Sequence, residues 1–361
     1  MGLRIVCALV CALAMSGAKA DLAADLAQVA NNVKRVKAQW ANGEFPARLE
    51  LDADIAALGK MIDGGQLNQA GLAVALYYRA DANLLRNAWR LKNNQPVDVP
   101  AARSALKDYD RVIELGKDIP DWGVDVSNAA YSAGWVANYH LSSAPVAYSY
   151  WEKCADRGHA GCMSTMAAAH VSGAGAVKID LKRALDLNAR VYGTGVTYGC
   201  AGAYAARDNG MILYFGDVQH GPAEELEWLS RSRGVLDQLG KAQKMRNPCN
   251  RAKFEAIEYL VRYSQGDDRK AMLKTALELA ESPEDKAISR YLSGAIGDEA
   301  FSAAAMKSDS KYASCQMHFI AMWAAEINRN RTLSDEHLAA MKDIGPEFCG
   351  TELTYARKFR R

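Results

Sequence analysis

Apolar residues recur three and four positions apart along most of the chain, which is the spacing of one face of an α-helix. Alanine is abundant, β-branched runs are short, and glycine, proline, asparagine and aspartate interrupt the pattern at short intervals. Strict alternation of apolar and polar residues, which indicates a strand, never extends beyond a few positions. The pattern therefore predicts an all-α chain of many helices, each of about 10–18 residues.

Neighbouring helices are predicted to form antiparallel pairs. The first pair joins 75–87 (ALYYRADANLLRN) to 102–115 (ARSALKDYDRVIEL). Small side chains at Ala80 and Ala105 allow these helices to approach closely, and Tyr109 fills the space between them. A two-helix unit of this kind cannot bury its apolar face alone, so we expect further units to stack on it.

A second pair joins 128–140 (NAAYSAGWVANYH) to 144–158 (APVAYSYWEKCADRG), with Gly134 at the position of close approach. Helical spacing continues through 160–173, 180–195, 198–210, 221–241, 248–266, 268–282, 284–297, 311–330 and 335–345. The repeated two-helix rhythm predicts a solenoid.

The stretch 70–210 resembles the Sel1-like repeats, a subfamily of tetratricopeptide-like solenoids that carry a GxGVxxDxxKA pattern. The matching residues are Gly173, Gly175, Val177, Asp180 and Ala184, and Ala176 is an extra residue within the pattern. The resemblance implies a right-handed α-solenoid of antiparallel helix pairs, and it concerns the fold rather than an activity. The expected organisation is a capping helix in 21–50, a repeat region in 51–215 and a C-terminal repeat-like helical region in 216–361.

The first twenty residues have the pattern of an export signal. Arg4 precedes an apolar run over 5–15 that is too short to span a bilayer, and Ala18-Lys19-Ala20 fits a small-x-small cleavage site. We therefore expect a signal peptide over 1–20 and a bacterial periplasmic or secreted protein that does not span the membrane. Removal of Arg4 and Lys19 leaves a net charge near zero, which gives no reason to expect nucleic acid as a partner.

Six cysteines lie outside the predicted signal: Cys154, Cys162, Cys200, Cys249, Cys315 and Cys349. An even number in an oxidising compartment indicates disulfides, and six cysteines allow fifteen connectivities.

Cys154 falls in the last turn of one predicted helix and Cys162 in the first turn of the next, around a helix stop at Gly158. Such a corner brings Cα atoms within the ~4.4–6.8 Å that a disulfide needs, and the resemblance likewise implies a disulfide at this Cys-x7-Cys spacing. The position eight before Cys200 is Tyr192, so Cys200 has no local partner. The remaining hypothesis pairs Cys200 with Cys249 and Cys315 with Cys349.

No catalytic residue, metal ligand or cofactor site is predicted. HExxH and GxSxG are absent, and the glycine stretches 173–178 and 193–199 lack the GxGxxG spacing of a dinucleotide site. Ser-x-x-Lys occurs at Ser104/Lys107 and Ser308/Lys311, without the SDN and KTG partners of a penicillin-interacting enzyme. The resemblance to cysteine-rich Sel1-like proteins also implies such a hydrolase, which is the less favoured function.

Aromatic residues on the first helices of the pairs are the candidate binding residues. In the register of the family, five residues face the concave groove: Tyr77, Asp81, Tyr131, Trp135 and Tyr139. Exposed Trp and Tyr anchor partners, whereas the alternative is that they only fill space between helices. Trp135 is the first choice because its repeat position is not normally core. We expect an exported scaffold or adaptor for a protein or peptide, with binding of a cell-envelope glycan such as peptidoglycan as the alternative.

Overall fold

The computed structural model describes residues 17–41, 44, 51–116, 118–221, 223–244 and 248–360. Most of the predicted signal peptide therefore lies outside the described residues. The fold prediction is confirmed at the level of class: 81% of the described residues are helical, and neighbouring helices pack in sequence order. Among the described residues, no helix is both long enough and apolar enough to cross a membrane.

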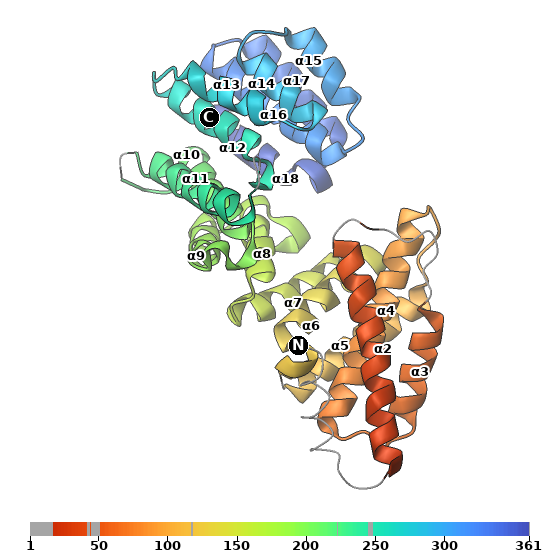
Figure 1. The fold of residues 1–361 in the computed structure, drawn as a ribbon. Coiled ribbons are helices and arrows are strands. Elements are labelled where there is room, and N and C mark those ends of the chain that lie inside the picture. Colours follow the sequence, from red (N-terminus) through yellow and green to blue (C-terminus); the bar gives the residue numbers. More distant parts are fainter. Residues whose placement is uncertain are drawn as a thin grey trace. The chain divides into compact units, whose positions relative to one another are not determined.

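The chain divides into two compact units, Met1–His159 and Ala160–Arg361, which we call the N-terminal unit and the C-terminal unit (Figure 1). The division falls inside the predicted repeat region 51–215. Each unit has its own packing and is described by itself.

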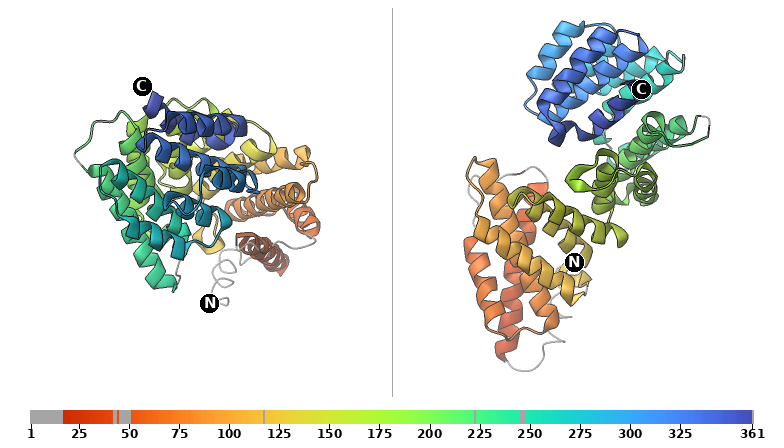
Figure 2. Two further views of the ribbon diagram at one scale, coloured as in Figure 1. Left: turned by 90° about the horizontal axis from the view of Figure 1, so that it is seen from above. Right: turned by 180° about the vertical axis from the view of Figure 1, so that it is seen from behind.

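The N-terminal unit consists of helix pairs preceded by one long helix. Its elements are α2 (Gly17–Ala41), α3 (Asp52–Asp63), α4 (Gln69–Lys92), α5 (Val99–Leu115), the 3-10 turn η1 (Pro120–Trp122), α6 (Val126–Trp135), the π-helix η2 (Val136–His140) and α7 (Ala144–Asp156). Helix α2 packs on both α3 and α4, and the two further views show the same arrangement (Figure 2).

Local sequence signals set the helix ends in this unit. The side chains of Asn68, Asp98 and Asp125 accept hydrogen bonds from backbone N–H groups in the first turns of α4, α5 and α6. Gly116 ends α5 with φ 66°, a left-handed conformation that costs glycine little.

The predicted close approaches are present in the N-terminal unit. Ala80 and Ala105 are fully buried where α4 packs on α5, and Tyr109 is buried with them. At the next pair, a Cβ added to Gly134 would lie 2.2 Å from Nε1 of Trp151, so only glycine fits between α6 and α7. Small residues therefore set the helix spacing here, as the sequence predicted.

The C-terminal unit begins at the corner after α7. Its elements are α8 (Ala160–Ser172), η3 (Ala174–Ala176), α9 (Leu181–Gly193), η4 (Gly195–Tyr198), α10 (Ala201–Phe215), α11 (Glu224–Gln243), η5 (Pro248–Asn250), α12 (Arg251–Ser264), α13 (Lys270–Leu279), α14 (Pro283–Leu292), α15 (Asp298–Met306), α16 (Lys311–Ile327), α17 (Arg331–Ile344), α18 (Pro346–Ala356) and η6 (Arg357–Arg360).

Helices α16 and α18 of the C-terminal unit make contacts beyond their neighbours in the chain. Helix α16 packs on α12 and α14 as well as on α15 and α17, and it lies among them in Figure 1. It is apolar around most of its circumference, with Met317, Phe319 and Trp323 all buried, which is typical of a central helix. Helix α18 returns to contact α8 and α10. In a regular solenoid each repeat contacts only its neighbours, so this unit is more closed than the repeat pattern predicts.

Candidate functional site

Three aromatic residues run along one helix of the N-terminal unit, and we call them the aromatic face: Tyr131, Trp135 and Tyr139. Tyr131 is half-buried, whereas Trp135 is 39% and Tyr139 is 54% exposed. The rings of Trp135 and Tyr139 stack with centroids 4.5 Å apart and planes 16° apart, and Tyr131 meets Trp135 edge-on at 6.1 Å. The sequence-predicted Trp135 and Tyr139 therefore form one continuous exposed aromatic surface.

A change of helix type holds this stack in register. Helix α6 ends at Trp135 and continues as the π-helix Val136–His140, in which the N–H of Leu141 donates to the carbonyl of Val136 across 3.1 Å. In an α-helix, which has 3.6 residues per turn, two residues four positions apart are separated by slightly more than one turn. The π-helix has more residues per turn, so it brings Trp135 and Tyr139 closer to the same face. Single π turns of this kind occur frequently at functional sites.

Trp151 of α7 packs against the buried side of the aromatic face. It is 3% exposed, its ring lies 6.2 Å from that of Trp135, and Tyr148 meets it edge-on at 5.1 Å. The indole Nε1 of Trp151 donates to the carbonyl of Tyr131 across 3.2 Å. The sequence comparison of repeats did not identify Trp151 as part of the site, although its place opposite Gly134 is the signal that could have done so.

The two remaining groove candidates are not on the surface. Tyr77 is 3% and Asp81 is 1% exposed, because the side chains of α2 and α5 enclose them. Asp81 accepts hydrogen bonds from Tyr109 Oη at 2.5 Å and from Lys37 Nζ at 2.7 Å. The Lys37 ammonium also lies 5.4 Å from the centre of the Tyr77 ring.

Helix α2 thus occupies the face of α4 that the family register assigned to the groove. Its buried residues Leu26, Ala30 and Val33 belong to the same core as the apolar side chains of α4. This geometry leaves Tyr77 and Asp81 with a packing role in the described structure, and it restricts the exposed candidates to Trp135 and Tyr139.

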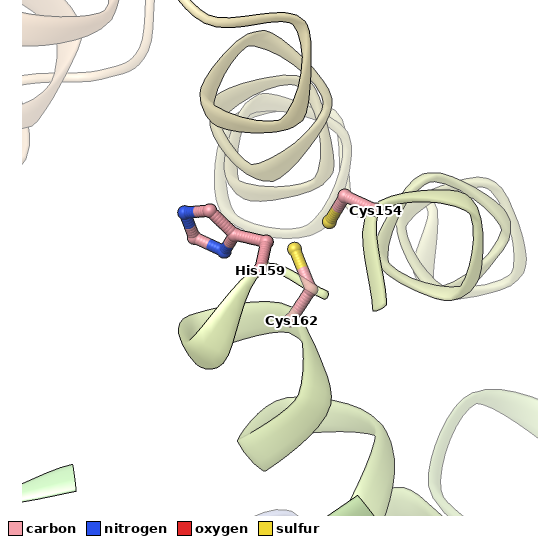
Figure 3. Close-up of side chains that lie close together, drawn as sticks. All are labelled: Cys154, His159 and Cys162. Atoms are coloured by element: carbon pink, nitrogen blue, oxygen red, sulfur yellow. The ribbon is translucent and has the colours of Figure 1, made fainter. Parts of the chain in front are cut away.

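The corner between α7 and α8 carries the first cysteine pair (Figure 3). Cys154 and Cys162 are both fully buried and both disulfide-bonded, and their sulfur atoms face one another. Gly158 between them has φ +87°, which confirms the predicted helix stop.

His159 lies beside this pair, and the three side chains place one ligand atom each within 4.8 Å of one another. Its Nε2 donates to Oδ1 of Asn128 across 2.9 Å, and its ring lies 4.9 Å from that of Tyr131. Burial lowers the pKa of the imidazole, which disfavours its charged form. A disulfide offers no thiolate to a metal, and one histidine alone does not make a zinc site. His159 therefore fixes the corner against the aromatic face.

The other two cysteine pairs are as hypothesised. Cys200 and Cys249 have Cα atoms 5.4 Å apart, and Cys315 and Cys349 have Cα atoms 5.7 Å apart, within the usual range for a disulfide. Both bonds lie within the C-terminal unit.

The Ser-x-x-Lys matches do not form serine–lysine pairs in the described contacts. Ser308 Oγ donates to the carboxylate of Glu284 at 2.8 Å, and the Lys311 ammonium lies over the ring of Phe348 at 5.3 Å. Ser104 and Lys107 are both exposed on α5. In these contacts neither lysine is placed to take the proton of its serine hydroxyl, as a serine–lysine mechanism requires.

Sequence reasoning missed one further cluster. Arg207, Asp208, Lys253 and Glu352 line a cavity in the C-terminal unit. They come from α10, α12 and α18, which are far apart in the chain, so no local motif joins them.

Comparisons with known proteins do not assign a family. No protein-family model matches the chain, and no curated protein matches it either.

Proposed function

We propose that this protein is an exported helical scaffold that binds a peptide segment of a protein partner on the aromatic face. The observation that carries the proposal is the exposed stack of Trp135 on Tyr139. Large apolar side chains are rarely left stacked and exposed without a reason, and Trp and Tyr dominate the energetic centres of protein interfaces.

Rigidity of the aromatic face supports the same proposal. The ring of Trp135 packs against buried Trp151 and against Tyr131. Because these contacts already restrict its side chain, little conformational freedom is lost when a partner docks. The three cysteine pairs at disulfide distance are compatible with an extracellular compartment, which supports the exported part of the proposal. By analogy of fold, the Sel1-like resemblance of 70–210 supports a binding role, because stacked helix pairs present an extended surface.

The experiment compares the wild type with Trp135→Ala and Tyr139→Ala in selection from a random peptide display library. Selected peptides are then synthesised, and their affinities are measured for each variant. We expect each substitution to weaken binding by about tenfold or more, since interface hot spots cost about 2 kcal/mol or more on truncation. Met306→Ala is the matched control, because Met306 is an exposed apolar residue, 76% exposed, in the C-terminal unit.

Two outcomes would contradict the proposal. Peptides that bind Trp135→Ala as tightly as the wild type would remove the aromatic face as their site. Retention of the wild type, but not of Trp135→Ala, on purified peptidoglycan sacculi, without any selected peptide, would instead favour glycan binding, in which the rings stack on sugars. Thermal unfolding of each variant checks that the fold is retained.

A further inference from the structure

A cavity of about 120 Å³ lies within the C-terminal unit, walled by α8, α9, α10, α12, α16 and α18. One part of its wall is apolar: Val171, Met211, Ile212, Ile257, Phe319 and Ile320. The other part is charged or polar: Arg207, Asp208, Lys253, Gln316 and Glu352. Its volume corresponds to about four water molecules, so it accommodates a short apolar group beside a polar head.

A second hollow of about 240 Å³ shares the polar part of this wall. Arg207, Lys253, Tyr312 and Gln316 line both spaces. The second hollow also includes Asn250, whose buried side-chain Oδ1 has no hydrogen-bond partner among the described residues. A buried acceptor without a donor is costly, so this atom is a place for a ligand N–H group.

The guanidinium of Arg207 is fixed in the shared wall. It pairs with Asp208 at 2.6 Å and lies 5.1 Å and 5.2 Å from the ring centres of Tyr204 and Phe254. The disulfide of Cys249 with Cys200 ties the segment before α12 to α10, close to the same wall. An arginine held on two aromatic rings keeps its remaining N–H donors in a defined direction.

The ammonium of Lys253 has no carboxylate at contact distance among the described residues, although the more distant charges of Asp285, Glu352 and Glu284 favour its protonated form. It donates to the amide oxygen of Gln316, and among the described residues no carboxylate forms an ion pair with it. Burial lowers the pKa of Lys253, which reflects the cost of holding this charge out of water. A bound carboxylate would remove that cost by supplying an opposite charge at hydrogen-bond distance.

Glu352 lines the same cavity, but it does not form an ion pair with Lys253. Its side chain is 8% exposed, and it forms no ion pair among the described residues. Burial raises the pKa of its carboxyl group to about 7, although Arg207 and Lys253 oppose this shift. With Arg207 paired to Asp208, Lys253 is the one uncompensated charge among the charged residues that line the cavity whenever Glu352 is protonated.

We propose that this cavity binds an amino-acid-like ligand through its carboxylate and its short apolar side chain. The carboxylate lies against Lys253 and Arg207, the apolar side chain enters the space lined by Ile257 and Phe319, and an adjacent N–H group donates to Asn250. A free apolar amino acid and the C-terminal residue of a peptide share this chemistry. The site is separate from the aromatic face and does not depend on the function proposed for it.

The test uses calorimetric titration of the full chain with N-acetyl-leucine and with N-acetyl-leucinamide, which differ only in the carboxylate. We expect saturable binding of the acid, with the amide about tenfold weaker or more, because hydrogen bonds to a charged group are the strong ones. Free leucine and a pentapeptide that ends in leucine distinguish the two sources. Binding of free leucine or N-acetyl-leucine as tight as that of the peptide identifies the small molecule, whereas tighter binding of the peptide identifies a chain terminus.

Two variants test the assignment to this cavity. Lys253→Met removes the charge and keeps an unbranched side chain one atom shorter, and we expect it to weaken binding of the acid about tenfold, to the level of the amide. Lys274→Met is the matched control on the exposed surface of α13 and should leave the affinity unchanged. Ala168→Phe places a ring at the edge of the cavity from an exposed position and should abolish binding without burying new volume in the core.

Three outcomes would overturn the proposal. They are equal binding of acid and amide, equal affinity of the Lys253→Met and Lys274→Met variants for the acid, and no saturable binding of any of the four probes to the wild type. The comparison of probes needs no variant, so it remains decisive if Lys253→Met does not fold.

Discussion

Gly134 of α6 lies directly against the indole ring of Trp151 in α7, and three ring atoms of the tryptophan would fall within 2.6 Å of a Cβ at this glycine. The contact determines how closely the two helices pack beneath the aromatic face. It also places the indole Nε1 where it donates to the Tyr131 carbonyl.

Gly134→Ala should therefore destabilise the N-terminal unit. Overpacking of a tight helix contact typically costs about 1–3 kcal/mol, because either the tryptophan or the backbone must shift. Urea unfolding followed by tryptophan fluorescence measures the change. Gly234→Ala on the exposed face of α11 is the control, since nothing lies within 4 Å of its added methyl group. That substitution should be neutral or stabilise by up to about 1 kcal/mol. Equal effects of the two substitutions would contradict the packing argument.

The three cysteine pairs should differ in their sensitivity to a reductant. Cys200 and Cys249 are half-buried, whereas Cys315 and Cys349 are fully buried. Access of the attacking thiolate governs exchange, so the bond between Cys200 and Cys249 should open first. Alkylation in stages under mild reduction, followed by peptide mapping, identifies the order. Detection of Cys200 as a free thiol before reduction would contradict this pairing.

Removal of the bond between Cys200 and Cys249 should lower stability. The two residues are 49 positions apart, and the chain-entropy relation gives about 4 kcal/mol for a loop of that length. Engineered losses are often smaller, so we expect about 2–4 kcal/mol for the double substitution to alanine, measured by urea unfolding. A stability equal to that of the wild type would show that the loop is already constrained in the unfolded chain.

A buried histidine pair predicts acid sensitivity of the C-terminal unit. The Nδ1 atoms of His318 and His337 are 3.0 Å apart, so one of them must be an unprotonated acceptor. Burial lowers both pKa values, that of His337 to about 4, below the unfolded value of about 6.5. The unfolded chain then binds more protons between these values. Stability from this pair is complete above pH 6.5 and is lost as the pH falls towards 4.

Substitution separates this effect from other titrations. His337→Phe should flatten the fall in unfolding free energy between pH 6.5 and 5, whereas His220→Gln, at an exposed loop position, should leave it unchanged. Glu352 acts in the opposite direction over this range, because its raised pKa makes the folded state bind the extra proton. A pH profile of His337→Phe that parallels the wild type would contradict the histidine assignment.

Ligand binding in the charged cavity should weaken as the pH rises through 7. Ionised Glu352 repels the incoming carboxylate, and each unit by which the ligand raises the pKa of Glu352 corresponds to a tenfold change in affinity. Calorimetry with N-acetyl-leucine at pH 6 and 8 measures the change, and Glu352→Gln should remove it. The other charged or titratable groups that act on Glu352, or on its neighbours Lys253 and Tyr355, are Arg207, Asp208, Lys253, Glu284, Asp285, Tyr312 and Tyr355. A pH dependence that persists in Glu352→Gln would assign it to one of these groups.

Features with a local physical cause could be predicted from the sequence. The close approach at Gly134 follows from one small residue at a helix crossing, and the helix stop at Gly158 follows from a glycine between two helical patterns. The three cysteine pairs followed from spacing and from the small number of partners left.

Features that depend on distant segments could not be predicted. The burial of Tyr77 and Asp81 depends on Lys37, which lies 44 positions before Asp81 on a helix whose placement no repeat pattern specifies. The charged cavity likewise combines Arg207 with Glu352, and neither residue belongs to a motif. Helical spacing predicts which face of a helix is buried but not which other helix buries it.

The contact of α18 with α8 has a consequence for how the C-terminal unit folds. The two helices lie at opposite ends of that unit in the chain, so their docking closes nearly its whole length into one loop. Arrays of nearest-neighbour repeats nucleate anywhere and propagate, whereas contacts between remote segments slow folding. We therefore expect the C-terminal unit to fold in a single cooperative step at the rate of a globular domain, and to resist the stepwise unravelling from one end that is typical of repeat arrays.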